Sequence, residues 1–244
     1  GSIVHDWSPN GFDGLIFKSD ELGSPGAQGY GLWLSTNGFT SNPSKGYLLA
    51  RVEEPTNYTE LTVNFWVCCT NDFSEQLNFV NQWNFGPNAE WYFSATHPTN
   101  FFFVYDGKTG TQHSLSSPPV NYLSPANAPV WHMLTAVLDL SKTNLSLYFD
   151  SQLVASKSET EPVNFVPGIG LSIGGITGIQ LFQGGIDELK IYNRALSQGE
   201  IICLANQVNP NLFETAASTN LWLNTLELQR NPENESKSTP ALAI

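Results

Sequence analysis

The feature that most constrains this chain is a series of short apolar segments, each followed by residues that make turns. In residues 61–67, apolar side chains alternate with polar or aromatic ones, the period of two that is typical of a β-strand. Clusters of Gly, Pro, Asn and Ser separate it from similar segments at residues 77–83, 90–95, 101–105, 131–139, 145–149, 153–155, 171–173 and 185–192. So many short strands predict an all-β fold, an antiparallel sandwich or barrel.

The one clear helix signal lies near residue 200. Ser197 and Glu200 have the spacing of a capping box, in which two side chains bond the first free backbone N–H groups of a helix. The apolar residues 201–204 follow directly. We therefore expect one short helix that ends near Asn206.

The composition agrees with a β-rich core. Charged residues make up 13% of the chain, about half the usual share, and aromatic residues make up 12%. Few Lys and Glu residues indicate few exposed helices, whereas aromatic residues fit the half-buried surface of a sheet. With 41% hydrophobic residues, a chain of 244 residues can bury one large core.

The charge balance excludes some classes of partner. With 10 basic and 22 acidic residues the net charge is −12, which disfavours binding to nucleic acid or to an anionic membrane. Because no run of eighteen apolar residues occurs, we expect no membrane insertion. A neutral sugar or a protein surface remains as a partner, and the oligomeric state is not indicated.

The chain divides into three parts by composition. We expect residues 3–209 to form the sandwich. Residues 210–230 contain leucines and aromatic residues and are expected to pack on it as an extension. Residues 231–244 begin with a polar stretch without apolar periodicity, so we expect a disordered tail.

Residues 182–201 resemble a known motif. This segment contains Gly-Gly-Ile-Asp-Glu-Leu-Lys-Ile-Tyr-Asn-Arg-Ala-Leu-Ser and is similar to the closing motif of concanavalin A-like modules of the laminin G and pentraxin type. Residues 130–137 with 145–155 resemble the family's Trp-His strand and hairpin, and residues 61–67 its early Trp-containing strand. Residues 5–14 are similar to its opening turn. The resemblance covers roughly residues 3–206 and implies a jelly-roll sandwich of two antiparallel sheets.

Catalytic residues are hard to find in this sequence. A glycosidase needs two carboxylates on either side of the scissile bond, and the Glu-x-Asp-x-x-Glu spacing of similar sandwich hydrolases does not occur. The histidines and arginines are not grouped as a polysaccharide lyase requires, and no Gly-x-Ser-x-Gly is present. An enzyme is therefore less favoured than a binding protein, and a glycoside hydrolase or polysaccharide lyase stays as an alternative.

A lectin-type site needs less: aromatic rings that stack on sugar C–H faces, and side-chain amides that bond sugar hydroxyls. The alternating segments contain such residues, which would form one surface if their strands are neighbours. The competing interpretation is that the aromatic residues pack in the core. The candidate ligand-binding residues are Asn64, Trp66, Gln82, Trp83, Trp91 and Tyr105.

Calcium is a third candidate. Members of the resembled family often carry one structural Ca²⁺ that joins the N-terminal segment to the last strand. The position that matches its side-chain ligand is Asp187, and Asp6 or Asp13 in the opening turn would supply another oxygen. The alternative for Asp187 is a carboxylate that accepts hydrogen bonds from backbone amides.

Together these observations predict a non-catalytic, extracellular or cell-surface module that binds carbohydrate or mediates adhesion. Its partner would be a glycan or glycoprotein. The alternatives are the glycan-cleaving enzyme and a protein-binding structural domain on the same fold.

Overall fold

The structure is a computed structural model that describes part of the chain. The described residues are 3–4, 13–17, 21–28, 30–34, 47–50, 57–69, 76–82, 91–96, 99–105, 111–120, 130–159, 163–164, 170–175, 182, 184–206, 229–230 and 242–243. Trp83, Asp6 and most of the residues expected to form an extension and a tail lie outside them.

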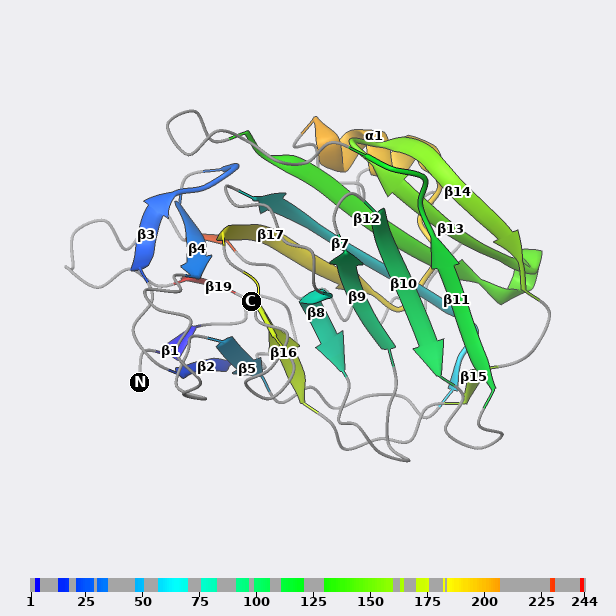
Figure 1. Cartoon of the computed structure of the whole chain (residues 1–244), viewed down its shortest axis with the longest axis horizontal. Helices are drawn as coiled ribbons and strands as arrows, with labels where there is room; N and C mark the ends of the chain where they lie inside the picture. The colour runs from blue at the N-terminus through cyan, green and yellow to red at the C-terminus, as the bar shows by residue number, and fades with distance from the viewer. Residues whose placement is uncertain are drawn as a thin grey trace, which may run out of the picture.

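Two large antiparallel sheets make up most of the part of the chain that the structure describes (Figure 1). The eight-stranded sheet has the order β1 (Ile3–Val4), β2 (Gly14–Phe17), β5 (Tyr47–Ala50), β16 (Leu171–Ile173), β8 (Leu77–Gln82), β9 (Trp91–Thr96), β10 (Thr99–Tyr105) and β11 (Gln112–Ser116). The seven-stranded sheet has the order β14 (Gln152–Ser158), β13 (Asn144–Phe149), β12 (His132–Asp139), β7 (Glu60–Cys68), β17 (Gly184–Tyr192), β4 (Tyr30–Leu34) and β3 (Glu21–Pro25).

Two further pairs of short strands are β6 (Asn57–Tyr58) with β15 (Val163–Asn164), and β18 (Gln229–Arg230) with β19 (Leu242–Ala243). A 3₁₀ turn, η1 (Leu140–Lys142), links β12 to β13. The predicted two-sheet antiparallel sandwich with one short helix is confirmed. No described helix is long and apolar enough to cross a membrane.

The core lies between the two sheets, because each contributes the apolar side of its alternating pattern. On β7 the inward residues include Phe65, whose ring centroid lies 5.6 Å from that of Phe79 and 5.1 Å from that of Phe93 on the opposite sheet. All three rings are buried. These aromatic contacts join the two sheets at the centre of the sandwich.

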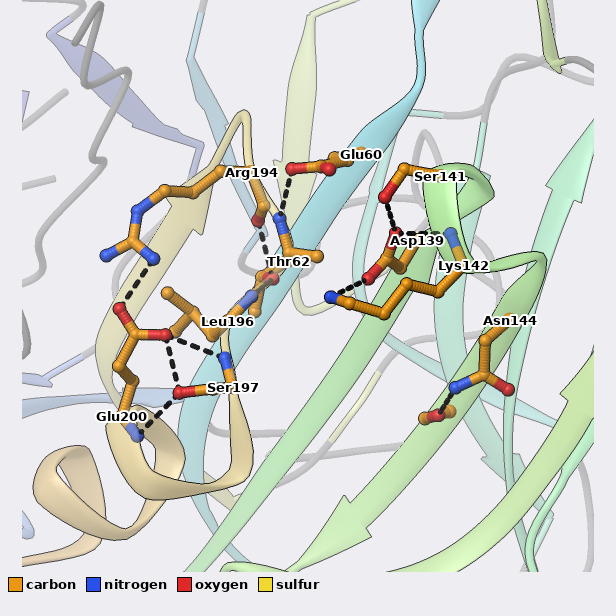
Figure 2. A network of polar contacts seen from close by, with 12 residues as sticks. Glu60, Thr62, Asp139, Ser141, Lys142, Asn144, Arg194, Leu196, Ser197 and Glu200 are labelled. Atoms are coloured by element: carbon orange, nitrogen blue, oxygen red, sulfur yellow. Dashed lines mark hydrogen bonds and ion pairs between the residues drawn. The ribbon is translucent and has the colours of Figure 1, made fainter. Parts of the chain in front are cut away.

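Helix α1 (Gln198–Ala205) covers part of the outer face of the seven-stranded sheet, and its capping box forms as predicted. Figure 2 shows Glu200 accepting hydrogen bonds from the Ser197 backbone at 2.7 Å and from Arg194 at 2.6 Å. The Thr62 hydroxyl of β7 bonds the carbonyl of Arg194 at 2.8 Å and the amide of Leu196 at 3.0 Å. The helix start is therefore fixed both by its own cap and by the sheet beneath it.

Glycines make room for a large side chain at the other end of this outer face. A Cβ atom placed on Gly185 of β17 would lie 2.3 Å from the Cη2 atom of Trp131, and one on Gly31 of β4 would lie 3.3 Å from it. The Trp131 ring also meets Trp33 edge to face, with centroids 5.6 Å apart. The indole of Trp131 thus packs directly on glycine backbone.

The edges of the two sheets meet on one side of the sandwich. His113 of β11 and Glu159, directly after β14, are joined by a contact of 2.9 Å between Nδ1 and Oε1. The histidine is only 2% exposed. This buried pair links the last strand of one sheet to the last strand of the other.

Candidate functional site

The outer face of the eight-stranded sheet carries polar side chains on three neighbouring strands. On β9, Trp91, Phe93 and Ala95 belong to the core, so the alternate residues Tyr92 and Ser94 lie on the outer face. The register places Asn81 of β8 opposite Tyr92, and Asn78 opposite Ser94.

An irregularity in β8 brings both asparagines to the same face. The register shifts between Asn78 and Val80, so that Phe79 and Val80 both reach the core and Asn81 returns to the outer side. Ser172 of β16 lies opposite Asn81 and continues the row onto the next strand.

Two buried side chains of this polar surface donate hydrogen bonds to the same carbonyl group. The Asn81 Nδ2 atom donates a hydrogen bond to the Gly175 carbonyl at 2.8 Å, and the Ser172 hydroxyl donates to the same oxygen at 2.6 Å. Asn81 is 0% exposed, and its Oδ1 atom has no hydrogen-bond partner within the part of the chain that the structure describes. A buried amide oxygen of this kind is an open acceptor, which costs free energy unless a ligand or water satisfies it.

Among the side chains of this face that the structure describes, Tyr92 is the accessible aromatic one. Its ring is half-buried, and its hydroxyl is hydrogen-bonded to Gln76, which in turn donates to the Ser94 hydroxyl at 3.4 Å. Burial raises the pKa of the Tyr92 hydroxyl above its usual value, so the group stays neutral at pH 7. A neutral, oriented phenol can stack on an apolar surface and exchange hydrogen bonds with a ligand.

The face continues over β10 onto β11. The register aligns Tyr92 with Phe103 and then Ser114. Ser114 is exposed, as are the alternate residues of β11 on either side of it, Gln112 and Ser116. Figure 1 shows β8, β9, β10 and β11 side by side in front of the seven-stranded sheet. We call this surface the polar face, defined by Gln76, Asn78, Asn81, Tyr92, Ser94, Gln112, Ser114, Ser116 and Ser172.

The comparison with protein families agrees with this architecture. A family model described as the concanavalin A-like lectin/glucanases superfamily, of the laminin G type, matches residues 42–202, well over half of the chain. The chain belongs to the concanavalin A-like superfamily. The resemblance inferred from residues 182–201 is thereby confirmed.

Solved structures of the concanavalin A-like fold include several toxin binding domains similar to this chain. The binding domain of Paraclostridial Mosquitocidal Protein 1 is 18% identical with a TM-score of 0.65, and the match covers 83% of this chain and 49% of that one. Two botulinum neurotoxin DC binding domains, one in complex with SialylT and one with rat synaptotagmin II, are 13% and 12% identical with TM-scores of 0.64 and 0.62. Each match covers 84% of this chain and 50% of the toxin domain.

At these identities the likeness shows the fold alone, and the chain spans about half the length of the structures it matches. A search of curated protein sequences finds no significant match.

The structure separates the ligand-binding residues expected from the sequence. Asn64 and Trp66 lie on the outer face of the seven-stranded sheet, where Asn64 is buried and donates to the Thr135 hydroxyl at 2.7 Å. Trp66 is half-buried and packs beside the apolar cluster under α1. Asn64 and Trp66 are therefore engaged in hydrogen bonding and packing on the seven-stranded sheet, whereas the polar face lies on the eight-stranded sheet.

Gln82 and Trp91 lie opposite each other on β8 and β9 and point into the sandwich. Trp91 is 0% exposed, so its ring has no free surface on which a sugar can stack. Tyr105 lies opposite Gln112 at the end of β10, in register with the polar face, and Trp83 lies outside the described residues. The described residues thus do not form the single aromatic surface that the sequence led us to expect.

Asp187 accepts a hydrogen bond from a backbone amide, which was the alternative interpretation of this residue. Its Oδ2 atom accepts a hydrogen bond of 3.0 Å from the Gln28 amide in the loop between β3 and β4. The carboxyl group is 0% exposed, and burial raises its pKa to about 7. Its neighbour Glu188 has a positive φ of 51° at a bulge in β17 and pairs with Lys190.

The described residues do not complete a calcium site at Asp187. Calcium needs six to eight oxygen ligands. Within the described ranges, no group of three or more His, Cys, Asp or Glu side chains is placed to hold a metal ion. Asp187 keeps one oxygen, Oδ1, without a hydrogen-bond partner in that part of the chain, and Asp13 is exposed. Asp6 is not among the described residues, and the calcium ion stays a prediction.

Several residues of the polar face were missed by sequence reasoning. In β9 the alternation of Tyr92 and Ser94 with Trp91, Phe93 and Ala95 is the signal that could have identified the outward side. For Asn81 no such signal exists, because the irregular register in β8 breaks the period of two.

Proposed function

We propose that this chain is a non-catalytic carbohydrate-binding module and that the glycan lies on the polar face. The observation that carries the proposal is the half-buried Tyr92 in register with the exposed side chains of β11, above buried amides and hydroxyls on β8, β9 and β16, on the side of the sheet that faces away from the apolar core. Sugar recognition uses the same combination of an aromatic ring and oriented neutral polar groups.

In the proposed complex the Tyr92 ring stacks on the C–H face of one sugar residue. Gln76 fixes the tyrosine hydroxyl, and the exposed side chains of β11 contact the neighbouring sugars. Asn81 and Ser172 hold the Gly175 backbone below, so that the floor of the site does not rearrange on binding. Tyr105 lies opposite Gln112, two residues along β10 from the row of Tyr92, and is kept from the sequence prediction.

Binding is favoured over cleavage by the roles of the described carboxylates. Asp139, Glu188 and Glu200 each pair with a Lys or Arg side chain. Glu159 pairs with His113, and Asp187 accepts a backbone amide. Carboxylates that already have such partners serve the fold, whereas a glycosidase needs a pair aimed at its substrate.

The proposed setting is outside the cytoplasm, on a secreted or surface protein, with a glycan or glycoprotein as partner. Similar solved structures support it: a botulinum neurotoxin DC binding domain is in complex with SialylT in one and with rat synaptotagmin II in another, and cell entry of botulinum neurotoxin type C depends on interaction with two ganglioside molecules. A calcium ion at Asp187 is a separate proposal. It predicts that millimolar calcium raises the melting temperature and that Asp187→Asn removes this effect.

Glycan-array binding tests the proposal. Tyr92→Ala is expected to weaken binding at least tenfold, because it removes the stacking ring. Tyr148→Ala is the matched control: Tyr148 is also half-buried, but it packs near α1 on the other sheet. Loss of binding in Trp66→Ala with normal binding in Tyr92→Ala would move the site to the seven-stranded sheet. Release of reducing ends from a polysaccharide panel would instead support the enzyme.

A further inference from the structure

The polar face is built from uncharged groups. Its described side chains are the amides of Asn78, Asn81, Gln76 and Gln112 and the hydroxyls of its serines and Tyr92. Such groups donate and accept hydrogen bonds with sugar hydroxyls without any charge on the ligand. His113 of β11 is not part of this face, because it is buried on the inner side of the sheet and contacts Glu159.

Four of the described basic residues are engaged on the other sheet or its connections. Lys142 lies 2.7 Å from Asp139, and Lys157 lies 3.4 Å from Glu159. Lys190 pairs with Glu188, and Arg194 lies 2.6 Å from Glu200. Each of these four cations already has a carboxylate partner, which a second anion would have to displace.

The net charge of the whole chain also disfavours an anionic ligand. With 22 acidic and 10 basic residues, the net charge of −12 repels an anionic ligand over distances up to the Debye length. A sialic acid, uronate or sulfate group therefore approaches the polar face against this field and finds neutral partners there.

Resting on the proposed function, we infer that the ligand class of the polar face is a neutral glycan, made of uncharged hexose-type sugars. Acidic sugars are discriminated against by the charge of the chain and by the neutral groups on the face. Recognition depends on hydrogen bonds between the sugar hydroxyls and the exposed side chains of β11, together with Tyr92.

The test uses the full chain and immobilised neutral oligosaccharides, each paired with its own sialylated form. At low salt we expect each bound neutral form to bind about fivefold more tightly than its sialylated partner. This preference should narrow at high salt, because salt screens the repulsion. Equal or stronger binding of the sialylated forms would overturn the inference.

A charge added to the face should reverse the preference. Ser114 is exposed and lies in the row of Tyr92, two strands away, which is about 10 Å at the usual strand spacing. Ser114→Lys is expected to improve binding of the sialylated forms about fivefold relative to that of their neutral partners. Gln198→Lys, at an exposed position on α1, adds the same charge on the far side of the other sheet and should leave this ratio unchanged.

The outcomes separate this inference from the proposed function. If sialylated forms bind as well as neutral ones and Tyr92→Ala abolishes both, the site stands and the neutral class is wrong. The test also includes Lys108→Gln, because Lys108 follows β10 in the sequence and lies outside the described residues. Loss of sialylated binding in this variant would identify the cation that overturns the inference. If Tyr92→Ala leaves all glycan binding unchanged, the proposed site itself is wrong.

Discussion

Gly185→Ala tests whether the packing of Trp131 on bare backbone is required. The new methyl group would lie 2.3 Å from Cη2 and 2.9 Å from Cζ2 of the indole, well inside van der Waals contact. The ring has little room to retreat, because Gly31 and Trp33 border it. Overpacking of this kind costs about 1–3 kcal/mol. In a chain of this size the melting temperature should fall by about 2–4 °C for each kcal/mol.

The assay is urea unfolding followed by tryptophan fluorescence and circular dichroism. Gly199→Ala on α1 is the matched control, because its Cβ meets only the Ser197 hydroxyl at 3.9 Å. This control should be neutral or stabilising by up to about 1 kcal/mol, since alanine favours a helix. In a Trp131→Phe background the cost of Gly185→Ala should shrink by more than about 0.5 kcal/mol. A Gly185→Ala protein as stable as the wild type, or one without this coupling, would refute the reasoning.

Three further changes test other parts of the structure. Asp187 has a folded pKa of about 7 against 3.8 for the free side chain, so its contribution to stability is complete below about pH 4 and is lost as pH rises through 7. In EDTA, the unfolding free energy of the wild type should fall by at most about 4 kcal/mol over this pH range, and Asp187→Asn should remove that fall. An Asp187→Asn protein whose unfolding free energy depends on pH as that of the wild type does would contradict the effect of burial. Ser197→Ala should lower the unfolding free energy by about 1 kcal/mol, and an unchanged urea midpoint would show that the cap is dispensable. Phe65→Ala should cost about 3–5 kcal/mol by the same assay, and a loss below 1 kcal/mol would contradict its central place in the core.

The fold was predictable where local signals agree with the final environment. Alternation in β7 identified both of its faces, and the spacing of Ser197 and Glu200 located the helix start. These features depend on neighbours within one strand or one helical turn, which the sequence lists directly.

The candidate site was harder to predict because it depends on which strands become neighbours. Asn64 looked like a free polar residue, but its partner Thr135 is 71 residues away and becomes adjacent only when β7 pairs with β12. Trp91 was a binding candidate because of its chemistry, and the competing interpretation, packing in the core, is the one that its burial supports. The irregular register of β8 moved Asn81 to the outer face, and no sequence period indicates such a shift.

The buried contact between His113 and Glu159 has a consequence for how the sandwich opens. Terminal strands of a sheet normally fray first and offer their backbone to other chains. Here the two terminal strands β11 and β14 belong to different sheets but share one enclosed histidine and carboxylate. If either strand separates from the sandwich, the buried side chain of the other strand loses its partner. Hydrogen exchange of the backbone amides in both strands should therefore require unfolding of the entire sandwich.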